Sequence, residues 1–311
     1  MPSPSWLCCW QHGASGSGSM KIIVRVPGSC GELVQGYWQG QPFLLTCPID
    51  WYTTVCIEDT MPQRIVCGEK AKQALEKTLA YLGKSSFPFT LTLSSQIPRE
   101  KGMASSSADI GAVVIAVAAA FQTTLTPQEI AYIAASIEPT DGVFCPGLVM
   151  MNYRTGQCLH TYPTVPPMEV VIFDTGDTLN TAAYHRQFDD KERRYGAYAW
   201  HGCAHLKKNY TAADIGKAAT YSAMLHQQVQ YRADVPILLH IGRQYGSCGI
   251  VIGHSGTVMG LLFPKHAIHS VNIAALTACV QQHTHLQVIG TAAIISGGWQ
   301  LEIEDTYATT I

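Results

Sequence analysis

Charge is scarce in this chain. Lys, Arg, Asp and Glu together make up 14% of its 311 residues, and the formal net charge at pH 7 is −2. The sequence has no basic run and no strip of basic residues interleaved with aromatic ones. Proteins attract the phosphate backbone of nucleic acids through such features. We therefore expect no nucleic-acid partner.

Long hydrophobic runs are also missing. The longest apolar run, residues 110–121, is rich in alanine and is shorter than the roughly 20 residues that span a bilayer as a helix. Residues 1–10 have neither the basic start nor the long apolar centre of a signal peptide. The sequence therefore predicts no membrane partner and a cytoplasmic location.

Cysteine pairs of the C-x-x-C type are absent, although the chain has 11 cysteines. Their irregular scatter favours free thiols in a reducing compartment over a disulfide framework. The arrangement nearest to a metal-binding pattern is HGCAH at residues 201–205. On a helix the two histidines would share a face without the cysteine, and no acidic residue is near. We expect no metal site there.

Apolar residues, in contrast, make up 47% of the chain, which is long enough for two domains of ordinary size. Three prolines within residues 162–167 (YPTVPP) mark the best candidate boundary. Residues 13–19 (GASGSGS) have the composition of a flexible linker. We expect residues 1–19 to be a leader and linker, residues 20–165 an N-terminal domain and residues 166–311 a C-terminal domain.

Hydrophobic periodicity predicts strands and helices without a regular βαβ alternation, which indicates an α+β fold. The first strand, residues 21–26, is expected to end at Pro27 and Gly28. Further strands are predicted at 43–47, 51–58, 87–93, 148–153, 157–161 and 169–173, within 249–263 and within 288–304. Helices are predicted at about 69–82, 106–121, 126–137, 189–209, 212–228, 235–245 and 266–283.

The second predicted helix follows a loop of small and hydroxyl-bearing residues, GMASSS at 102–107. Small residues let backbone N–H groups approach a ligand closely. The start of a helix adds unpaired N–H donors and the positive end of its dipole. This combination predicts a phosphate-binding loop. The alternative interpretation is a serine N-cap that leads into a buried helix.

Two carboxylates follow the third predicted helix. That helix opens with a capping box between Thr126 and Glu129, so we expect Glu129 to cap the helix and not to catalyse. Its end is broken by EPTD at residues 138–141. The break places Glu138 and Asp141 about one turn apart, and carboxylates of this kind can bind a metal or move a proton. A solvated glutamate and an Asx turn are the alternatives.

Three spaced motifs resemble those of the GHMP kinases, the small-molecule kinases of galactose, homoserine and mevalonate. They are PGSCGELVQG at 27–36, PREKGMASSSA at 98–108 and GHSGTVMG at 253–260. The resemblance covers the chain from Met20 onward. It implies a two-domain α+β fold, with an N-terminal ribosomal-S5-domain-2-like part and a C-terminal ferredoxin-like α/β sandwich. Ala104 and Ser107 depart from the family's usual Gly and Ala.

Within this superfamily the motifs resemble those of kinases that phosphorylate L-threonine for the aminopropanol arm of cobalamin biosynthesis. The resemblance implies ATP and L-threonine as small-molecule substrates, Mg²⁺ as cofactor and O-phospho-L-threonine as product. A monomer and a homodimer are both compatible with it. Another GHMP kinase, such as a homoserine kinase, and a catalytically silent nucleotide-binding relative are the alternatives. A dinucleotide-dependent oxidoreductase is disfavoured, because no G-x-G-x-x-G turn follows the first strand.

The resemblance also implies roles for the second motif and for the two carboxylates. Ser105 or Ser106 would offer a hydroxyl to Mg²⁺, and Glu138 would supply a carboxylate. Asp141 would accept or orient the proton of the substrate hydroxyl, which makes Asp141, Glu138 and Ser105 the expected catalytic set. The residues expected to bind the phosphates of ATP are Lys101, Gly102, Met103, Ala104, Ser105, Ser106 and Ser107.

An amino-acid substrate needs one partner for its carboxylate and another for its ammonium group. Arg186, in TAAYHR at residues 181–186, resembles the position where homoserine kinases hold the substrate carboxylate, a bidentate task that suits a guanidinium. Glu32 is the candidate for the ammonium group, and a structural ion pair with Arg186 is the alternative. The full set expected to bind the substrate is Ser29, Glu32, Thr181, Arg186, His254 and Ser255.

Overall fold

The computed structural model describes residues 20–177, 190–191, 193–203, 206 and 209–305. The strands are β1 (Met20–Trp38), β2 (Gln41–Glu58), β3 (Ile65–Val66), β4 (Thr90–Ser95), β5 (Leu148–Asn152), β6 (Gln157–Tyr162), β7 (Met168–Asp174), β8 (Gly249–Ile252), β9 (Val258–Pro264), β10 (Gln287–Ile294) and β11 (Gln300–Asp305). The helices are α1 (Glu69–Tyr81), α2 (Ser105–Ala120), α3 (Pro127–Ala135), α5 (Trp200–Cys203), α6 (Ala212–His226), α7 (Asp234–Gln244), α8 (Lys265–Ile268) and α9 (Ile273–His283).

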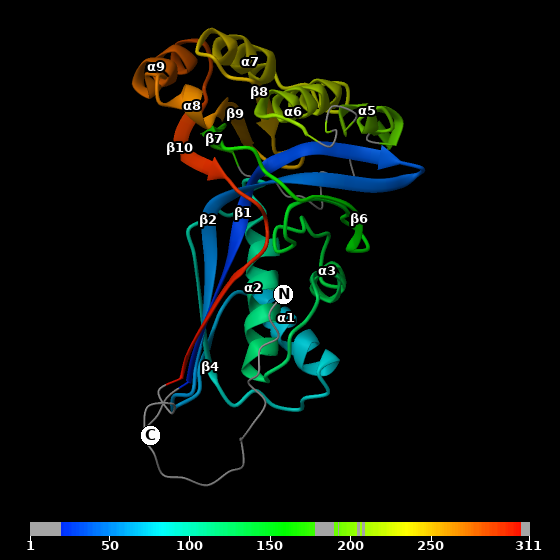
Figure 1. Ribbon diagram of the computed structural model, residues 1–311, viewed down its shortest axis with the longest axis vertical. Coiled ribbons are helices and arrows are strands. Elements are labelled where there is room, and N and C mark those ends of the chain that lie inside the picture. The colour runs from blue at the N-terminus through cyan, green and yellow to red at the C-terminus, as the bar shows by residue number, and fades with distance from the viewer. Residues whose placement is uncertain (1–19, 178–189, 192, 204–205, 207–208, 306–311) are drawn as a thin grey trace.

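One continuous sheet of 11 strands runs through the described residues, in the order β11-β1-β8-β9-β7-β10-β2-β4-β3 with β5 and β6 attached to β2. Its longest part is the antiparallel hairpin of β1 and β2, which runs from the bottom of the lower lobe up to the upper lobe, beneath the layer of helices there (Figure 1). The mixture of helices with a largely antiparallel sheet confirms the predicted α+β class.

β1 passes straight through the first motif. The prediction that this strand ends at Pro27 and Gly28 is wrong, because the strand continues to Trp38. Shifts in register against β2 occur at Pro27/Gly28, Ser29/Glu32 and Glu32/Val34. Bulges of this kind accommodate a proline inside a strand and redirect the side chains around it. The motif is therefore a distorted strand and not a turn.

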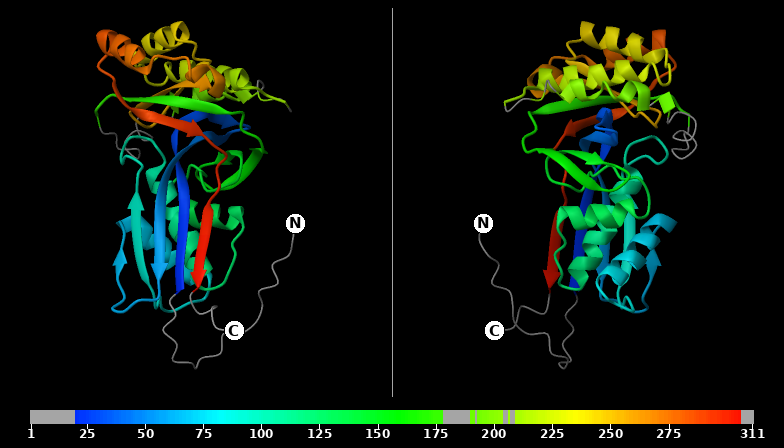
Figure 2. Two further views of the ribbon diagram at one scale, coloured as in Figure 1. Left: turned by 60° about the vertical axis from the view of Figure 1, so that its left-hand side comes forward. Right: turned by 90° about the vertical axis from the view of Figure 1, so that its right-hand side faces the viewer.

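The lower lobe of Figure 1 is formed by the lower parts of β1 and β2, by β4, and by helices α1, α2 and α3 on one face of these strands (Figures 1 and 2). α2 is buried on nearly all sides, and its alanine, valine and glycine residues account for the absence of charge on most of its length. The predicted helices at 69–82, 106–121 and 126–137 are confirmed as α1, α2 and α3 within a few residues at each end.

The upper lobe of Figure 1 contains β7 to β10 with helices α5 to α9 above them. A second apolar core lies here and includes Phe173, Ile250, Leu261 and Leu276. The helix predicted at 266–283 is two helices, α8 and α9. The helix predicted at 189–209 falls partly outside the described residues; within that range, residues 190–191 and 193–196 and the short α5 are helical.

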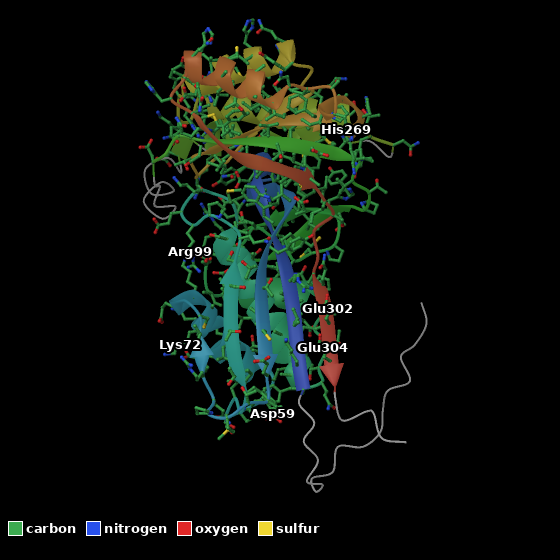
Figure 3. The ribbon with its side chains drawn as sticks, turned by 90° about the vertical axis from the view of Figure 1, so that its left-hand side faces the viewer. Asp59, Lys72, Arg99, His269, Glu302 and Glu304 are labelled. Carbon is green, nitrogen blue, oxygen red and sulfur yellow. The ribbon has the colours of Figure 1, made fainter. Side chains whose placement is uncertain are left out.

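The final strand returns to the lower lobe and pairs with the first. β11 runs antiparallel to β1 from Met20 to Arg25, and Arg25 forms an ion pair of 2.6 Å with Glu302 across the two strands. Figure 3 shows Glu302 and Glu304 along β11. The predicted boundary at residues 165 and 166 stays a prediction, because the sheet is continuous across it.

Two further sequence predictions concern membranes and thiols. None of the helices in the described part of the chain has the length and apolar character needed to cross a membrane. The nine described cysteines are free thiols, and Cys30, Cys47, Cys145 and Cys203 are buried. The predicted leader, residues 1–19, lies outside the described residues.

The tight packing of α2 can be tested at Gly111. A Cβ at this position would lie 2.5 Å from Cδ1 of Phe144. Gly111→Ala is therefore expected to lower the free energy of unfolding by about 1–2 kcal/mol, since overpacking exceeds the gain in helix propensity. Urea unfolding measures this change. Gly68→Ala is the control, because its Cβ would meet nothing nearer than Nη1 of Arg99 at 3.7 Å. Equal stability of Gly111→Ala and the wild type would contradict the packing.

Candidate active site

The loop of the second motif ends at the start of α2 without a side-chain cap. The residue at the N-cap position is Ala104, with φ 57° and ψ 22°, and no side chain there accepts a hydrogen bond from the helix. The interpretation of a serine N-cap is therefore wrong. Without such a cap, the first N–H groups of α2 remain able to bind an anion. The hydroxyl-bearing Ser105 and Ser106 of this turn are partly exposed.

The three sequence motifs meet at this loop. Ser29 in the first motif donates its backbone N–H to the carbonyl of Met103 at 2.9 Å. The third motif forms a turn at residues 253–257, and Thr257 donates its N–H to the carbonyl of Lys101 at 3.0 Å. A Cβ on Gly102 would lie 2.7 Å from Cα of Gly256. The loop and the turn therefore approach each other more closely than any residue other than glycine permits there.

The side chain of Lys101 forms an ion pair with a residue of the upper lobe. Its Nζ lies 2.8 Å from Oδ2 of Asp174, a buried carboxylate at the end of β7. The other oxygen of Asp174 accepts a hydrogen bond of 2.5 Å from the Thr257 hydroxyl. Lys101 therefore anchors the loop through both its side chain and its carbonyl. The predicted contact of Lys101 with phosphate stays a prediction.

The two predicted carboxylates lie beside the start of α2. The Ser107 hydroxyl donates to Oδ2 of Asp141 at 3.0 Å and accepts from the Asp141 N–H at 3.1 Å. The hydroxyl of Thr46, on β2, donates to the Asp141 carbonyl. Asp141 is thus held against the first turn of α2 by contacts to both its side chain and its backbone.

Several buried oxygen atoms near this turn have no hydrogen-bond partner among the described residues. They are Oε1 of Glu138, Oγ of Ser29 and Oγ1 of Thr140. The other carboxylate oxygen of Glu138 forms an ion pair with Lys70 at the start of α1. Buried polar atoms without a partner are rare in native proteins and mark sites that a ligand, ion or water completes. The carboxylate of Glu138 and the serine hydroxyls of α2 are oxygen donors of the kind that Mg²⁺ prefers.

Asp109, which no motif singled out, is a further carboxylate near the start of α2. It lies in the first turns of α2, is 6% exposed, and accepts hydrogen bonds from Thr53 at 2.8 Å and from Arg99 at 3.3 Å. Burial raises the pKa of the Asp109 carboxyl, and the nearby charge of Glu138 raises it further, against the hydrogen bond from Thr53 and the charge of Arg99. The signal available in the sequence was the one acidic residue on an otherwise uncharged helix.

Glu32 and His254 join the first motif to the third. Oε2 of Glu32 accepts a hydrogen bond of 2.8 Å from the His254 backbone N–H and lies 3.1 Å from Nδ1 of its ring. Nε2 of His254 lies 3.2 Å from the hydroxyl of Ser222 on α6. That hydroxyl also accepts the N–H of Gln35 at 3.1 Å. The partner of Glu32 in this structure is therefore His254, while Thr181 and Arg186 lie outside the described residues.

A small cavity of about 20 Å³, room for about one water molecule, lies beside this hydrogen-bonded chain. Its polar wall is formed by Gln35, Ser222, His226 and His254, and its other side chains include Tyr37, Tyr153 and Tyr195. The rings of His226 and His254 are 4.7 Å apart. The cavity therefore lies between β1 and α6, with His254 in its wall. Ser255 belongs to the turn at 253–257 but does not line the cavity.

The structure brings the sequence-predicted residues together in two groups. The structure brings Ser29, Gly102, Met103 and Ser107 together with Asp141 around the start of α2. Glu32 and His254 form the link on the side of the cavity. Within the described residues, no group of three or more His, Cys, Asp or Glu side chains is arranged to hold a metal ion.

Comparisons with known proteins agree with this geometry. Residues 69–147 match the model of the GHMP kinases N terminal domain. The L-threonine kinase of Citrobacter freundii is 30% identical over 251 residues, which cover 78% of this chain and 87% of the relative. The L-threonine kinase of Salmonella typhimurium is 29% identical over 257 residues, which cover 80% and 85%. The homoserine kinase structure from Cytophaga hutchinsonii superposes with a TM-score of 0.65 at 14% identity, covers 94% of this chain and 100% of its own, and so shares the fold.

The histidine pair in the cavity wall predicts a loss of stability in acid. Burial lowers the pKa of His226 well below 6.5, and the nearby His254 and Arg232 lower it further. Below pH 6.5 the unfolded chain therefore binds a proton at His226 that the folded protein does not bind. The free energy of unfolding is expected to fall by up to about 1.4 kcal/mol per pH unit for this one group as the pH decreases.

Urea unfolding between pH 7 and pH 5 measures this slope. In His226→Asn the slope should be shallower by about one proton. His285→Asn, which replaces an exposed histidine, is the control and should keep the wild-type slope. An unchanged slope in His226→Asn would show that His226 titrates normally in the folded protein.

Proposed function

This chain belongs to the GHMP kinases, and we propose that it transfers the γ-phosphoryl group of ATP to the side-chain hydroxyl of L-threonine. The observation that carries the proposal is the pairing of Ser107 with Asp141 at the start of α2. It sets a carboxylate beside an uncapped helix start that suits an anion. A phosphoryl donor and an alcohol acceptor meet at such a place.

In the proposed reaction the protein mainly positions the reactants and offsets charge. The N–H groups of residues 105–107 bind the β- and γ-phosphates of ATP. The turn at 253–257 holds the loop in place, because Gly102 packs directly on Gly256. Asp141 accepts a hydrogen bond from the threonine hydroxyl and takes its proton as the oxygen attacks the γ-phosphorus, while the bond from that phosphorus to the bridging oxygen of ADP breaks and ADP leaves. The Ser107 hydroxyl keeps the Asp141 carboxylate oriented toward the start of the helix.

The carboxylate and hydroxyl oxygen atoms near the start of α2 suit Mg²⁺. The carboxylate of Glu138, which has one oxygen without a partner in the described residues, and the hydroxyl of Ser105 or Ser106 would hold it. When bound, the ion offsets the negative charge of the phosphates. Ser105 and Ser106 are adjacent in the first turn of α2, and the proposal leaves the choice between them to experiment.

The amino acid is proposed to bind beside Glu32 and His254, next to the small cavity. Its polar wall offers hydroxyl, imidazole and amide groups from Ser222, His226 and Gln35. Thr46, opposite Glu32 on the β1–β2 ladder, contacts the Asp141 carbonyl. Glu32 is therefore near enough to Asp141 for a short amino acid to extend from one toward the other. The roles of Thr181 and Arg186 at the substrate carboxylate, and the part of the product in cobalamin biosynthesis, stay predictions from the resemblance.

Two alternatives remain open to experiment. A homoserine kinase shares the fold, as the Cytophaga hutchinsonii structure demonstrates, and homoserine differs from threonine in chain length and branching. A silent nucleotide-binding relative is disfavoured, because such a protein need not keep Glu138 and Asp141 beside the phosphate loop.

A panel of acceptor alcohols tests the proposed substrate. We expect ATP-dependent ADP release with L-threonine at a kcat/KM at least about tenfold above that with L-homoserine or L-serine, which corresponds to about 1.4 kcal/mol of discrimination. ADP release measured by a coupled assay, with mass spectrometry of O-phospho-L-threonine, provides the readout. A higher kcat/KM with homoserine would make the protein a homoserine kinase. ATP binding without ADP release for any acceptor would favour the silent relative.

Asp141→Asn tests the proposed proton acceptor. The variant should lose about 100-fold or more in kcat, because amides are far weaker bases than carboxylates, while KM for ATP changes little. Asp59→Asn is the matched control, since Asp59 is exposed at the far end of the lower lobe (Figure 3). If Asp141→Asn keeps nearly full kcat with an unchanged pH profile, Asp141 orients the hydroxyl at most and does not accept its proton.

A further inference from the structure

The side chain of Arg232 donates hydrogen bonds to backbone carbonyl groups in the turn of the third motif. This arginine lies between α6 and α7, and its side chain is partly buried. Nη1 donates to the carbonyls of Gly253 and Gly256 at 3.1 and 3.2 Å, and Nη2 donates to the carbonyl of Thr257 at 3.1 Å. One guanidinium therefore closes both ends of the turn.

The opposite side of the same turn supports the phosphate loop. Gly256 packs against Gly102, and the N–H groups of Thr257 and Val258 both donate to the Lys101 carbonyl, at 3.0 and 3.3 Å. The shape of the turn therefore fixes where residues 101 and 102 lie. We infer that Arg232 is a positioning residue for ATP, which sets the phosphate loop through the turn at 253–257 without touching the nucleotide. This inference rests on the proposed kinase function.

The chemistry of the contact requires a guanidinium. Three carbonyl oxygens that point toward one place repel each other unless a cation with several donors lies between them. Arginine presents five N–H donors in a rigid planar fork. Lysine would bring a single compact charge on a flexible stem, which cannot match the spacing of three carbonyls from Gly253 to Thr257. We therefore expect the lysine variant to retain part of the effect and the alanine variant to lose it.

The backbone N–H and carbonyl groups of Arg232 are both hydrogen-bonded, which fixes the position of the residue. Its N–H donates to Oε1 of Gln227 at 2.8 Å, just beyond the end of α6. Its carbonyl accepts the N–H of Val235 at 3.2 Å, in the first turn of α7. The guanidinium therefore extends from a fixed point between two helices of the upper lobe. His226, which lines the cavity, belongs to the last turn of the same α6.

This arrangement predicts a selective defect. Loosening the turn displaces the loop that binds the β- and γ-phosphates, so ATP loses contacts that AMP never makes. A general loss of structure would weaken both nucleotides equally. The ratio between the two effects distinguishes a positioning role from a merely structural one.

The experiment compares Arg232→Ala and Arg232→Lys with the wild type in steady-state assays with L-threonine. For Arg232→Ala we expect kcat/KM for ATP to fall about 10- to 100-fold, while the Ki of AMP against ATP changes less than about twofold. For Arg232→Lys we expect an intermediate loss. The control is Arg243→Ala, which removes an exposed arginine at the end of α7 and should leave both constants unchanged. Circular dichroism melting of each variant establishes folding.

Three results would overturn the inference. The first is a wild-type kcat/KM for ATP in Arg232→Ala, and the second is an equal weakening of ATP and AMP. The third applies if Arg232→Ala does not fold: a wild-type kcat/KM for ATP in Arg232→Lys would then show that no fork is required. A wild-type protein that neither binds nor turns over ATP would instead refute the proposed function itself, which the wild-type assay reveals before any variant is compared.

Discussion

The close approach of two backbone segments is the constraint on which the rest of the site depends. Gly102 in the phosphate loop and Gly256 in the late turn pack Cα against Cα, and Thr257 donates its N–H to Lys101 across the contact. These segments are separated by about half of the chain, so their meeting requires the upper lobe to close on the lower one. In the proposed function, the start of α2 can bind an anion because contacts from the upper lobe hold the loop before it. Arg232, Asp174 and Glu32 all act on this contact from different directions.

The long hairpin of β1 and β2 makes that closure possible. Its lower part pairs with β4 and β11, and its upper part pairs with β8. The first motif lies where the strand changes partners, and the bulges there shift the register on both sides of Ser29 and Glu32, which stay opposite Pro48 and Thr46. One residue then contacts the phosphate loop and the other contacts the late turn. A regular strand could not serve both lobes in so few residues, because its side chains alternate strictly between two faces.

Local signals predicted much of the fold, and long-range contacts were beyond them. Periodicity and the capping box at Thr126 located α1, α2 and α3, while Pro27 and Gly28 wrongly predicted the end of a strand that a bulge carries onward. The loop at 102–107 and the nearby carboxylates were selected from residue type and from resemblance, and the structure brings Ser107 and Asp141 together, while their binding roles stay predictions. Two contacts join positions more than 20 residues apart: the ion pair of Lys101 with Asp174 and the hydrogen bond from Arg232 to the Gly253 carbonyl. No periodicity or motif in a single sequence encodes such partners, so only the folded chain reveals them.

The central claim is that the triphosphate of ATP lies against the first turn of α2 with Asp141 facing the acceptor hydroxyl. A crystal structure with a non-hydrolysable ATP analogue, Mg²⁺ and L-threonine tests it most directly. The account predicts the β- and γ-phosphates within hydrogen-bond distance of the N–H groups of residues 105–107, and the threonine hydroxyl within reach of the Asp141 carboxylate. Density for the triphosphate at another place, or for threonine on a side of the molecule that Asp141 does not face, would contradict it.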